Sequence, residues 1–384
     1  MIINRLIVKN WRNFQQIDVE LSPRQFIVGA NASGKSNLLD IFRFLRDIVK
    51  AEGGGFQKAV KDRGGVSKLR CLAARKDPEI AIEVHLADNS KSQTTWRYAI
   101  EFRQEPRGYR RTLLTYERVW KDDQLILNRP NEADKNDEAR LTQTFLEQLT
   151  VNADFREIAR CFQAITYLHL VPQLLRFADS IQGSVVEDDP FGQGFLERIA
   201  KIPEKTRRSR LRKIEGALKI AVPQLEQLEF IRDEITGRPH LQALYSHWHP
   251  KAGLQREDQF SDGTLRLLGF LWSLLENDSL LLLEEPELSL HTEIVSQLAV
   301  LISRMQRSQR RQIFVSTHSD ALLRDPGIDG REVLVLTPAK EGTEVNIASD
   351  LDPVRILLEN GMTAGEVVFS TTRPKYAEQF SLLC

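Results

Sequence analysis

The sequence predicts an α/β fold with a mixed β-sheet core, antiparallel strands near the N-terminus and a helical insertion. Three observations lead to this fold class. Apolar and polar residues alternate through the first twenty residues, as in the two strands of a hairpin. In the last third of the chain, short apolar runs alternate with segments of helical periodicity. Between these two parts, residues 142–225 are mostly helical in their pattern.

Each element is predicted from a local pattern. The hairpin is expected at residues 2–10 and 14–21, a short buried strand at 25–28, and a helix at 38–49 that a triple glycine ends. Further strands are expected at 79–88, 95–102 and 116–128, whereas 129–140 is polar and is expected to form an exposed loop or a fraying helix. The last third predicts a helix at 265–276, a strand at 279–283, a helix after residue 290, a strand at 312–317 and a closing hairpin at 332–338 and 343–349.

Composition limits the class of protein. The 384 residues are 41% apolar and 28% charged, as in globular proteins, and the 53 Lys and Arg equal the 53 Asp and Glu. The overall charge therefore favours neither a nucleic acid nor a membrane as partner. Cys71, Cys161 and Cys384 are far apart without a CxxC pair, which argues against a disulfide framework. With no apolar leader and no run of about 18 apolar residues, we expect a cytoplasmic protein without a membrane partner.

The stretch GANASGKS, residues 29–36, matches the phosphate-loop pattern G-x-x-x-x-G-K-[ST] at every fixed position, between an expected strand and an expected helix. Glycines let such a loop wrap a phosphate with its N–H groups pointing inward. The lysine reaches the β- and γ-phosphates and the last serine ligates Mg²⁺. The sequence thus predicts ATP and Mg²⁺ as cofactors, and a nucleotide site formed by Gly29, Asn31, Ser33, Gly34, Lys35 and Ser36.

Two further motifs follow apolar strands and are expected at the same sheet edge. LLLLEEPE ends in Glu284, which can hold the metal through its water shell, and Glu285, which can polarise the attacking water. STHSD brings His318, which can donate a hydrogen bond to the γ-phosphate and sense its loss. The alternatives are a solvated acidic turn and a structural histidine.

A second anion site is expected at FSDGT, residues 260–264, which opens an apolar helix. Ser261 and the Gly263 amide lie at that helix N-terminus, yet the chain has a single phosphate-loop motif. One nucleotide and two anion sites are reconciled if FSDGT of one copy covers the γ-phosphate held by another copy, across a two-fold axis. A plain N-cap is the alternative, which explains Ser261 but not Gly263.

In this order, GANASGKS, FSDGT, LLLLEEPE and STHS resemble the ABC ATPases of the SMC/RecF branch, and VKNWRNFQ is similar to that branch rather than to transporter ATPases. LLDIFRFLRDI, KDRGG, YLHLVPQLLR, SDGTLR, EEPELSLH and MTAGEV resemble stand-alone bacterial AAA family ATPases, nearly end to end. The resemblance implies a RecF-like head that hydrolyses ATP in a head-to-head dimer. It divides the chain into residues 1–140 (first lobe, Walker A), 141–278 (helical second lobe, signature) and 279–384 (Walker B, switch histidine, closing hairpin).

The resemblance also implies a role for each matching residue: Walker A for Lys35 and Ser36, Walker B for Glu284 and Glu285, the signature for Ser261 and Gly263, and the switch for His318. Residues 288–291 match the loop after Walker B that touches the partner subunit. Gln173 stands where a metal-binding, lobe-coupling glutamine is sought, although the family pattern there is Pro-x-x-Leu-Arg, and Arg12 is expected to reach the nucleotide. Asp262 departs from the usual small signature residue, so its side chain should turn away or meet a cation.

We expect a cytoplasmic ATP-driven switch that controls a partner effector, a toxin or nuclease, in phage defence. The alternative is a DNA-binding ATPase of RecF-like repair, in which the basic run at residues 205–213 would contact the phosphate backbone. A transporter motor is disfavoured by the FSDGT signature and the N-terminal strand. Only 66 residues follow His318 (384 − 318), so the nuclease domain of the OLD-type relatives is not expected.

Overall fold

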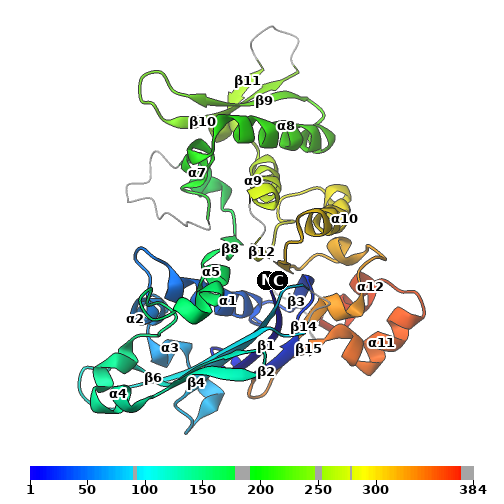
Figure 1. The fold of residues 1–384 in the computed structure, drawn as a ribbon. Coiled ribbons are helices and arrows are strands. Elements are labelled where there is room, and N and C mark those ends of the chain that lie inside the picture. The colour runs from blue at the N-terminus through cyan, green and yellow to red at the C-terminus, as the bar shows by residue number, and fades with distance from the viewer. Residues whose placement is uncertain (90–92, 178–190, 247–252, 277–278, 373–384) are drawn as a thin grey trace, which may run out of the picture.

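The computed structural model describes residues 1–89, 93–177, 191–246, 253–276 and 279–372, and it confirms the α/β fold class (Figure 1). Its described strands form a six-stranded antiparallel sheet, a six-stranded mixed sheet and a three-stranded sheet. In Figure 1 the antiparallel sheet lies at the bottom, the mixed sheet at the centre and the small sheet at the top. The molecule therefore has a lower lobe, which contains the phosphate-loop motif at residues 29–36, and an upper lobe, and the mixed sheet joins the two.

The antiparallel sheet contains the predicted N-terminal hairpin. Its strands have the order β2-β1-β4-β5-β6-β7. The predicted strand at 116–128 is two strands, because Asp122 and Asp123 both have positive φ (46° and 64°) and form a tight hairpin turn. The strands are Ile2–Trp11 (β1), Phe14–Glu20 (β2), Ile80–Ala87 (β4), Trp96–Gln104 (β5), Thr112–Lys121 (β6) and Gln124–Arg129 (β7).

The mixed sheet positions the predicted motifs. Its order is β15-β14-β3-β13-β12-β8, with β15 antiparallel to β14 and the other pairs parallel. The carboxyl ends of β3, β12 and β13 therefore meet at one edge, and the three motifs follow these strands. The strands are Arg24–Gly29 (β3), Thr166–Leu168 (β8), Leu281–Glu284 (β12), Ile313–Ser316 (β13), Val333–Ala339 (β14) and Gly342–Ile347 (β15).

Both faces of the mixed sheet are buried, which explains the unbroken apolar runs of its strands. Ile27 faces the core that also contains α1 and α5, whereas Phe26 and Val28 face a second core shared with α9 and α10. The described helices are Lys35–Val49 (α1), Phe56–Lys61 (α2), Val66–Leu69 (α3), Glu132–Asn136 (α4), Arg156–Gln163 (α5), Pro172–Arg176 (α6), Phe195–Lys201 (α7), Glu204–Ala221 (α8), Asp262–Glu276 (α9), Thr292–Gln309 (α10), Asp352–Glu359 (α11) and Ala364–Thr372 (α12).

The upper lobe is not wholly helical. It contains a small antiparallel sheet that the sequence analysis did not predict, made of Leu225–Arg232 (β9), Pro239–Tyr245 (β10) and Leu254–Arg256 (β11). Helix α8 packs through Leu211, Ile214 and Leu218 into the core beneath this sheet. Within residues 141–278, α5 and β8 instead join the lower lobe and the mixed sheet. The division at residues 140 and 278 stays a prediction.

The polar segment 129–140, expected to be an exposed loop or a fraying helix, is mostly exposed and contains the short helix α4, but two of its charged residues are buried. Arg129 is buried, and its guanidinium forms ion pairs at 2.9 Å with Glu117 and with Asp134, both also buried. Asn131 and Asp134 cap α4 reciprocally. The segment is thus anchored by a buried charge network, which a purely compositional argument does not reveal.

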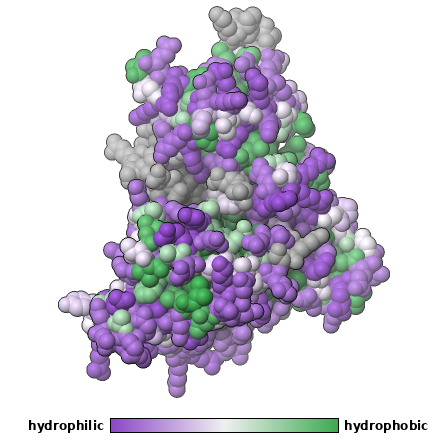
Figure 2. Space-filling view, viewed as in Figure 1, coloured by the Kyte–Doolittle hydropathy of each residue, from purple (hydrophilic) through white to green (hydrophobic). Residues whose placement is uncertain are grey.

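No helix in the described part of the chain is long and apolar enough to cross a membrane. The face drawn in Figure 2 is mostly hydrophilic, with smaller hydrophobic clusters between the hydrophilic areas.

Candidate functional site

The phosphate loop joins β3 to α1, and the N-terminal hairpin supports it. Gly34, with φ 100°, ends the loop in a left-handed conformation that favours glycine. A Cβ on Gly34 would collide with the amide of Asn13, whose Nδ2 donates to the Ser33 carbonyl at 2.9 Å. The Ser33 hydroxyl is buried without a hydrogen-bond partner, whereas Asn31 is exposed. The buried Ser33 hydroxyl is therefore a group that could bind a phosphate. Asn13 supports the loop and was not identified from the sequence.

Lys35 lies over the loop that precedes it. Its Nζ donates to the carbonyls of Gly29 at 3.1 Å and Ala30 at 3.4 Å, and the residue is only 6% exposed. Burial lowers the pKa of the ammonium, while the carboxylates of Glu285 and Glu284 act in the opposite direction. Because these carbonyl contacts are weaker than a bond to an anion, the Lys35 ammonium can exchange them for a bound phosphate with little movement of its side chain.

The predicted metal ligands Ser36 and Glu284 are in direct contact. The Ser36 hydroxyl donates to one oxygen of Glu284, and the Tyr167 hydroxyl donates to the other. Oxygen ligands of this kind suit Mg²⁺. Burial is the main cause of the raised pKa of Tyr167. Because a raised pKa keeps the hydroxyl protonated, this group acts as a hydrogen-bond donor. The guanidinium of Arg43 lies 4.2 Å from the ring centroid of Tyr167.

Tyr167 was not identified as a site residue from the sequence. Its strand β8 has three residues, and its position beside the acidic strand becomes visible only from the pairing of Tyr167 with Leu282. The signal that was available is a short strand-like run ahead of PQLLR that contains a tyrosine.

Glu285 and His318 meet at the ends of adjacent strands. Their side chains are 3.1 Å apart, from Nε2 to Oε1. Glu285 has φ 45°, a conformation uncommon for this residue type, and its N–H donates to the Ser316 carbonyl at 3.0 Å. Burial lowers the pKa of His318, the nearby charge of Lys35 lowers it further, and the carboxylate of Glu285 acts in the opposite direction. The His318 imidazole therefore lies against the carboxylate predicted to be the base.

A buried glutamate joins the two loops. Glu287 accepts hydrogen bonds from the Thr317 hydroxyl at 2.6 Å and from the His318 N–H at 3.0 Å. Its other oxygen is buried without a hydrogen-bond partner, and burial raises the pKa of the carboxyl group. Glu287 thus fixes the backbone of His318 relative to the acidic motif. This role was not predicted, although Glu287 is the third glutamate of the EEPELSLH stretch.

The FSDGT residues begin α9 beside the loop that follows the acidic motif. Ser261 is exposed, and its hydroxyl accepts from the Thr264 N–H at 3.1 Å, as an N-cap does. A Cβ on Gly263 would lie 2.5 Å from the Ser289 carbonyl oxygen, so only glycine allows this approach. The structure places the signature next to residues 288–291 of its own chain. Its contact with a second copy stays a prediction.

Asp262 meets a cation, as expected. The Arg176 guanidinium donates to Asp262 Oδ1 at 2.7 Å, and the Gln173 amide donates to Oδ2 at 3.2 Å. None of the hydrogen bonds found among the described residues joins Gln173 to Ser36 or Glu284. The structure therefore places Gln173 with the signature, and its role as a metal ligand stays a prediction.

Arg12 lies beside α1 rather than over the loop. Its guanidinium forms an ion pair with Asp40 at 2.9 Å, and Asp40 also pairs with Arg63 at 2.9 Å. The expected contact of Arg12 with a nucleotide stays a prediction.

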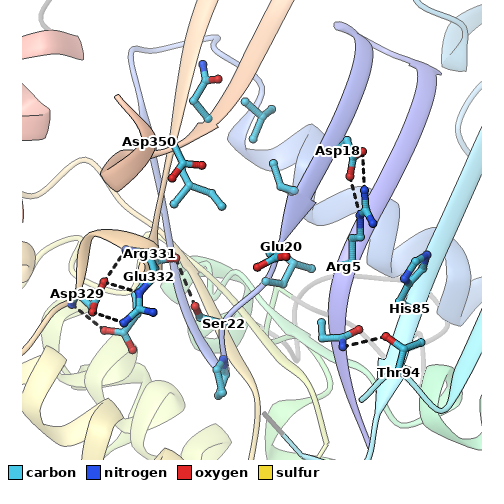
Figure 3. A pocket seen from close by; sticks show the side chains of 17 residues that line it. Arg5, Asp18, Glu20, Ser22, His85, Thr94, Asp329, Arg331, Glu332 and Asp350 are labelled. Atoms are coloured by element: carbon cyan, nitrogen blue, oxygen red, sulfur yellow. Dashed lines mark hydrogen bonds and ion pairs between the residues drawn. The ribbon is translucent and has the colours of Figure 1, made fainter. Parts of the chain in front are cut away.

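A separate polar cavity of about 1070 Å³ lies between the antiparallel sheet and the β14–β15 hairpin (Figure 3). It shares no residue with the motifs above. Two ion pairs lie in its walls, Arg5 with Asp18 at 2.8 Å and Arg331 with Asp329 at 2.9 Å, and a third wall residue, Glu332, pairs with Arg24 at 2.5 Å. Because its walls come from both sheets, we interpret it as a seam between them.

The fold and the strand-end motifs define an ABC-type ATPase of the SMC/RecF branch. Residues 26–324 match the family described as "AAA domain, putative AbiEii toxin, Type IV TA system", and the chain belongs to this family.

Similarity to individual proteins is more limited. The chain is 42% identical over 64 residues to the DNA replication and repair protein RecF of Actinobacillus pleuropneumoniae serotype 5b (strain L20), which is 16% of each chain. It is 28% identical over 90 residues to RecF of Lachnoclostridium phytofermentans, covering 23% of this chain and 25% of that protein. The alignments thus span a quarter or less of these curated relatives. The SMC head bound to the C-winged helix domain of ScpA superposes with a TM-score of 0.54 at 16% identity, covering 90% of this chain and 97% of that one, which shows a shared fold.

Proposed function

We propose that the chain hydrolyses ATP in a Mg²⁺-dependent reaction. The observation that carries this proposal is the arrangement at the sheet edge, where Ser36 touches Glu284 and Glu285 touches His318. Bound Mg²⁺ would be held by Ser36 and Glu284 and would neutralise charge on the β- and γ-phosphates. Lys35 would bind the same phosphates from the loop.

In this proposal, Glu285 acts on the attacking water. The carboxylate accepts the proton of a water molecule as that water attacks the γ-phosphorus, and the bond from the γ-phosphorus to the bridging oxygen breaks. His318 would donate to the γ-phosphate from its position against Glu285. The buried Glu287 keeps the backbone of His318 in place, so the base and the donor approach the phosphate as a unit.

We further propose that ATP joins two copies head to head. Ser261 is exposed at the start of α9, and a helix N-terminus attracts anions. In the dimer, Ser261 and the Gly263 amide would cover the γ-phosphate held by the other copy. Hydrolysis then removes the group that both copies share, so the dimer opens and the protein works as a switch.

The output of this switch is proposed to be a partner protein in the cytoplasm, an effector of toxin or nuclease type in phage defence. The family description, which names a toxin and a toxin-antitoxin system, supports this choice. Fold alone does not identify an output.

A second candidate is a DNA-binding ATPase of RecF-like repair, and one observation favours it. On α8 the apolar residues face inward, so the basic run forms an exposed stripe that includes Lys205, Arg208, Arg212 and Lys213. Arg208 also pairs with Glu204, which reduces the charge available to a phosphate backbone.

Steady-state ATP turnover by the purified chain, with and without duplex DNA, tests both candidates, with Lys35→Ala as the blank. Turnover above the blank that is indifferent to DNA supports the partner-protein switch. Stimulation by DNA, with binding that weakens steeply as salt rises, favours the repair ATPase. Turnover equal to that of the blank contradicts the proposed hydrolysis.

A further inference from the structure

The linker that leaves strand β8 follows the signature helix closely. Leu170 is buried and packs against Gly269 of α9, where a Cβ would collide with the Leu170 side chain. Leu175 of α6 is 2% exposed and anchors this short helix in the same core. The segment 167–176 is therefore packed along α9 rather than forming a free connection between the lobes.

At its far end, this segment binds the one acidic residue of the signature. Arg176 donates to the Phe260 carbonyl at 2.6 Å and to Asp262 at 2.7 Å, while Gln173 donates to the second oxygen of Asp262 at 3.2 Å. Both carboxylate oxygens are thus engaged on the α6 side, and the negative charge has a cation beside it. The Asp262 side chain is 36% exposed, so this charge also faces outward from the start of α9.

At its near end, the same segment touches the proposed metal site. The Tyr167 hydroxyl donates to Glu284, and Tyr167 pairs with Leu282 of the acidic strand. Only nine positions separate Tyr167 from Arg176 (176 − 167). One short stretch of chain therefore contacts the metal-binding carboxylate with its first residues and the signature with its last.

We propose that Arg176 is a positioning residue that allows an acidic signature to work. This proposal rests on the head-to-head dimer proposed above. When the dimer closes, Asp262 approaches the γ-phosphate of the other copy. Arg176 neutralises Asp262 and holds its carboxylate toward α6, so the closing surfaces do not place two anions against each other.

The experiment measures dimer formation by light scattering as ATP is titrated into the Glu285→Gln protein, which is expected to bind ATP without hydrolysing it. Adding Arg176→Ala should raise the ATP concentration needed for half dimerisation about tenfold, because like charges then meet at the interface. Binding of a fluorescent ATP analogue to the monomer should stay within about twofold, since Arg176 lies outside the phosphate loop.

Two further variants distinguish loss of the charge that neutralises Asp262 from loss of packing around Arg176. Combining Arg176→Ala with Asp262→Asn removes both charges and should restore dimerisation to within about twofold of the parent. Arg176→Lys keeps the charge and should retain most of the dimerisation if the alanine variant proves poorly folded by thermal melting. Arg208→Ala is the matched control, because it removes a cation from the same lobe and from a pair that is mostly exposed.

Three results would overturn the proposal. Unchanged dimerisation of the Arg176→Ala variant contradicts the positioning role of Arg176 but does not contradict the proposed dimer. Failure of Asp262→Asn to rescue that variant shows that Arg176 does not act through charge. A parent Glu285→Gln protein that stays monomeric with ATP bound contradicts both this proposal and the proposed dimer.

Discussion

The phosphate loop and the signature helix differ in what surrounds their polar groups. At the loop, the reactive groups already meet partners from the same chain: Lys35 the loop carbonyls, and Ser36 the carboxylate of Glu284. At the signature, Ser261 is exposed and, among the hydrogen bonds of the described residues, its hydroxyl bonds only to Thr264, while the neighbouring Asp262 is bound by Arg176 of α6. One chain therefore brings the residues of the predicted catalytic half together by itself, whereas in the proposed dimer the signature half would meet a ligand that another copy presents.

Lys35→Ala should have the largest effect on the catalytic half. It removes a buried ammonium that nothing nearby replaces, so we expect ATP affinity to fall about 100-fold, the effect of losing a charge-assisted bond of roughly 3 kcal/mol. Calorimetric titration with ATP and Mg²⁺ measures this change. Lys58→Ala, an exposed lysine paired with Asp62, is the control. Equal affinity of the Lys35→Ala and wild-type proteins would refute the phosphate-loop assignment.

Ser261→Phe tests the other half. A bulky side chain at the start of α9 should block closure, so turnover falls about tenfold or more while ATP affinity of the monomer is kept. Ser209→Phe, at an exposed position of α8, is the control for adding an aromatic side chain to the surface. If dimerisation and turnover were unaffected by Ser261→Phe, the signature would have no role across the interface.

Tyr167→Phe sharpens the account of the metal ligands. Loss of the hydroxyl leaves one oxygen of Glu284 without its donor, so the carboxylate is less well oriented. We expect the Mg²⁺ concentration needed for half-maximal ATP binding to rise about tenfold. Nucleotide binding without Mg²⁺ should not change. An unaltered Mg²⁺ dependence would mean that Tyr167 serves packing alone.

Arg12→Ala should have the smallest effect. Because the guanidinium is bound to Asp40, we expect a loss of about 1 kcal/mol or less in the free energy of unfolding and less than a twofold change in ATP affinity. Denaturant melts and ATP titration check the two quantities. A tenfold loss of affinity would instead support the sequence-based expectation that Arg12 swings to the nucleotide.

The parts of the fold that the sequence predicted are those with strong local patterns. Strands β3, β12 and β13 are short apolar runs buried on both faces, and α1 has a clear apolar stripe. In the β9–β11 sheet, β9 and β11 are largely exposed and their alternation is weak, whereas β10 does alternate between buried and half-buried residues and was overlooked. Strand β8 was missed because three residues are too few to show a period.

The candidate site divides in the same way. The phosphate loop and the acidic motif are each a single continuous stretch of sequence, so the spacing of residues within each stretch identifies it. Tyr167 and Arg176 act on residues 117 and 86 positions away, and only the three-dimensional pairing of β8 with β12 and of α6 with α9 brings them together. The charged residue that breaks the signature pattern, Asp262, was the sequence clue to Arg176.

The most direct test of the central claim is the molar mass of the Glu285→Gln protein by light scattering in saturating ATP and Mg²⁺, beside the same protein carrying Lys35→Ala. The proposed switch predicts a dimer for the first protein and a monomer for the second. A Glu285→Gln protein that binds ATP and stays monomeric would contradict it.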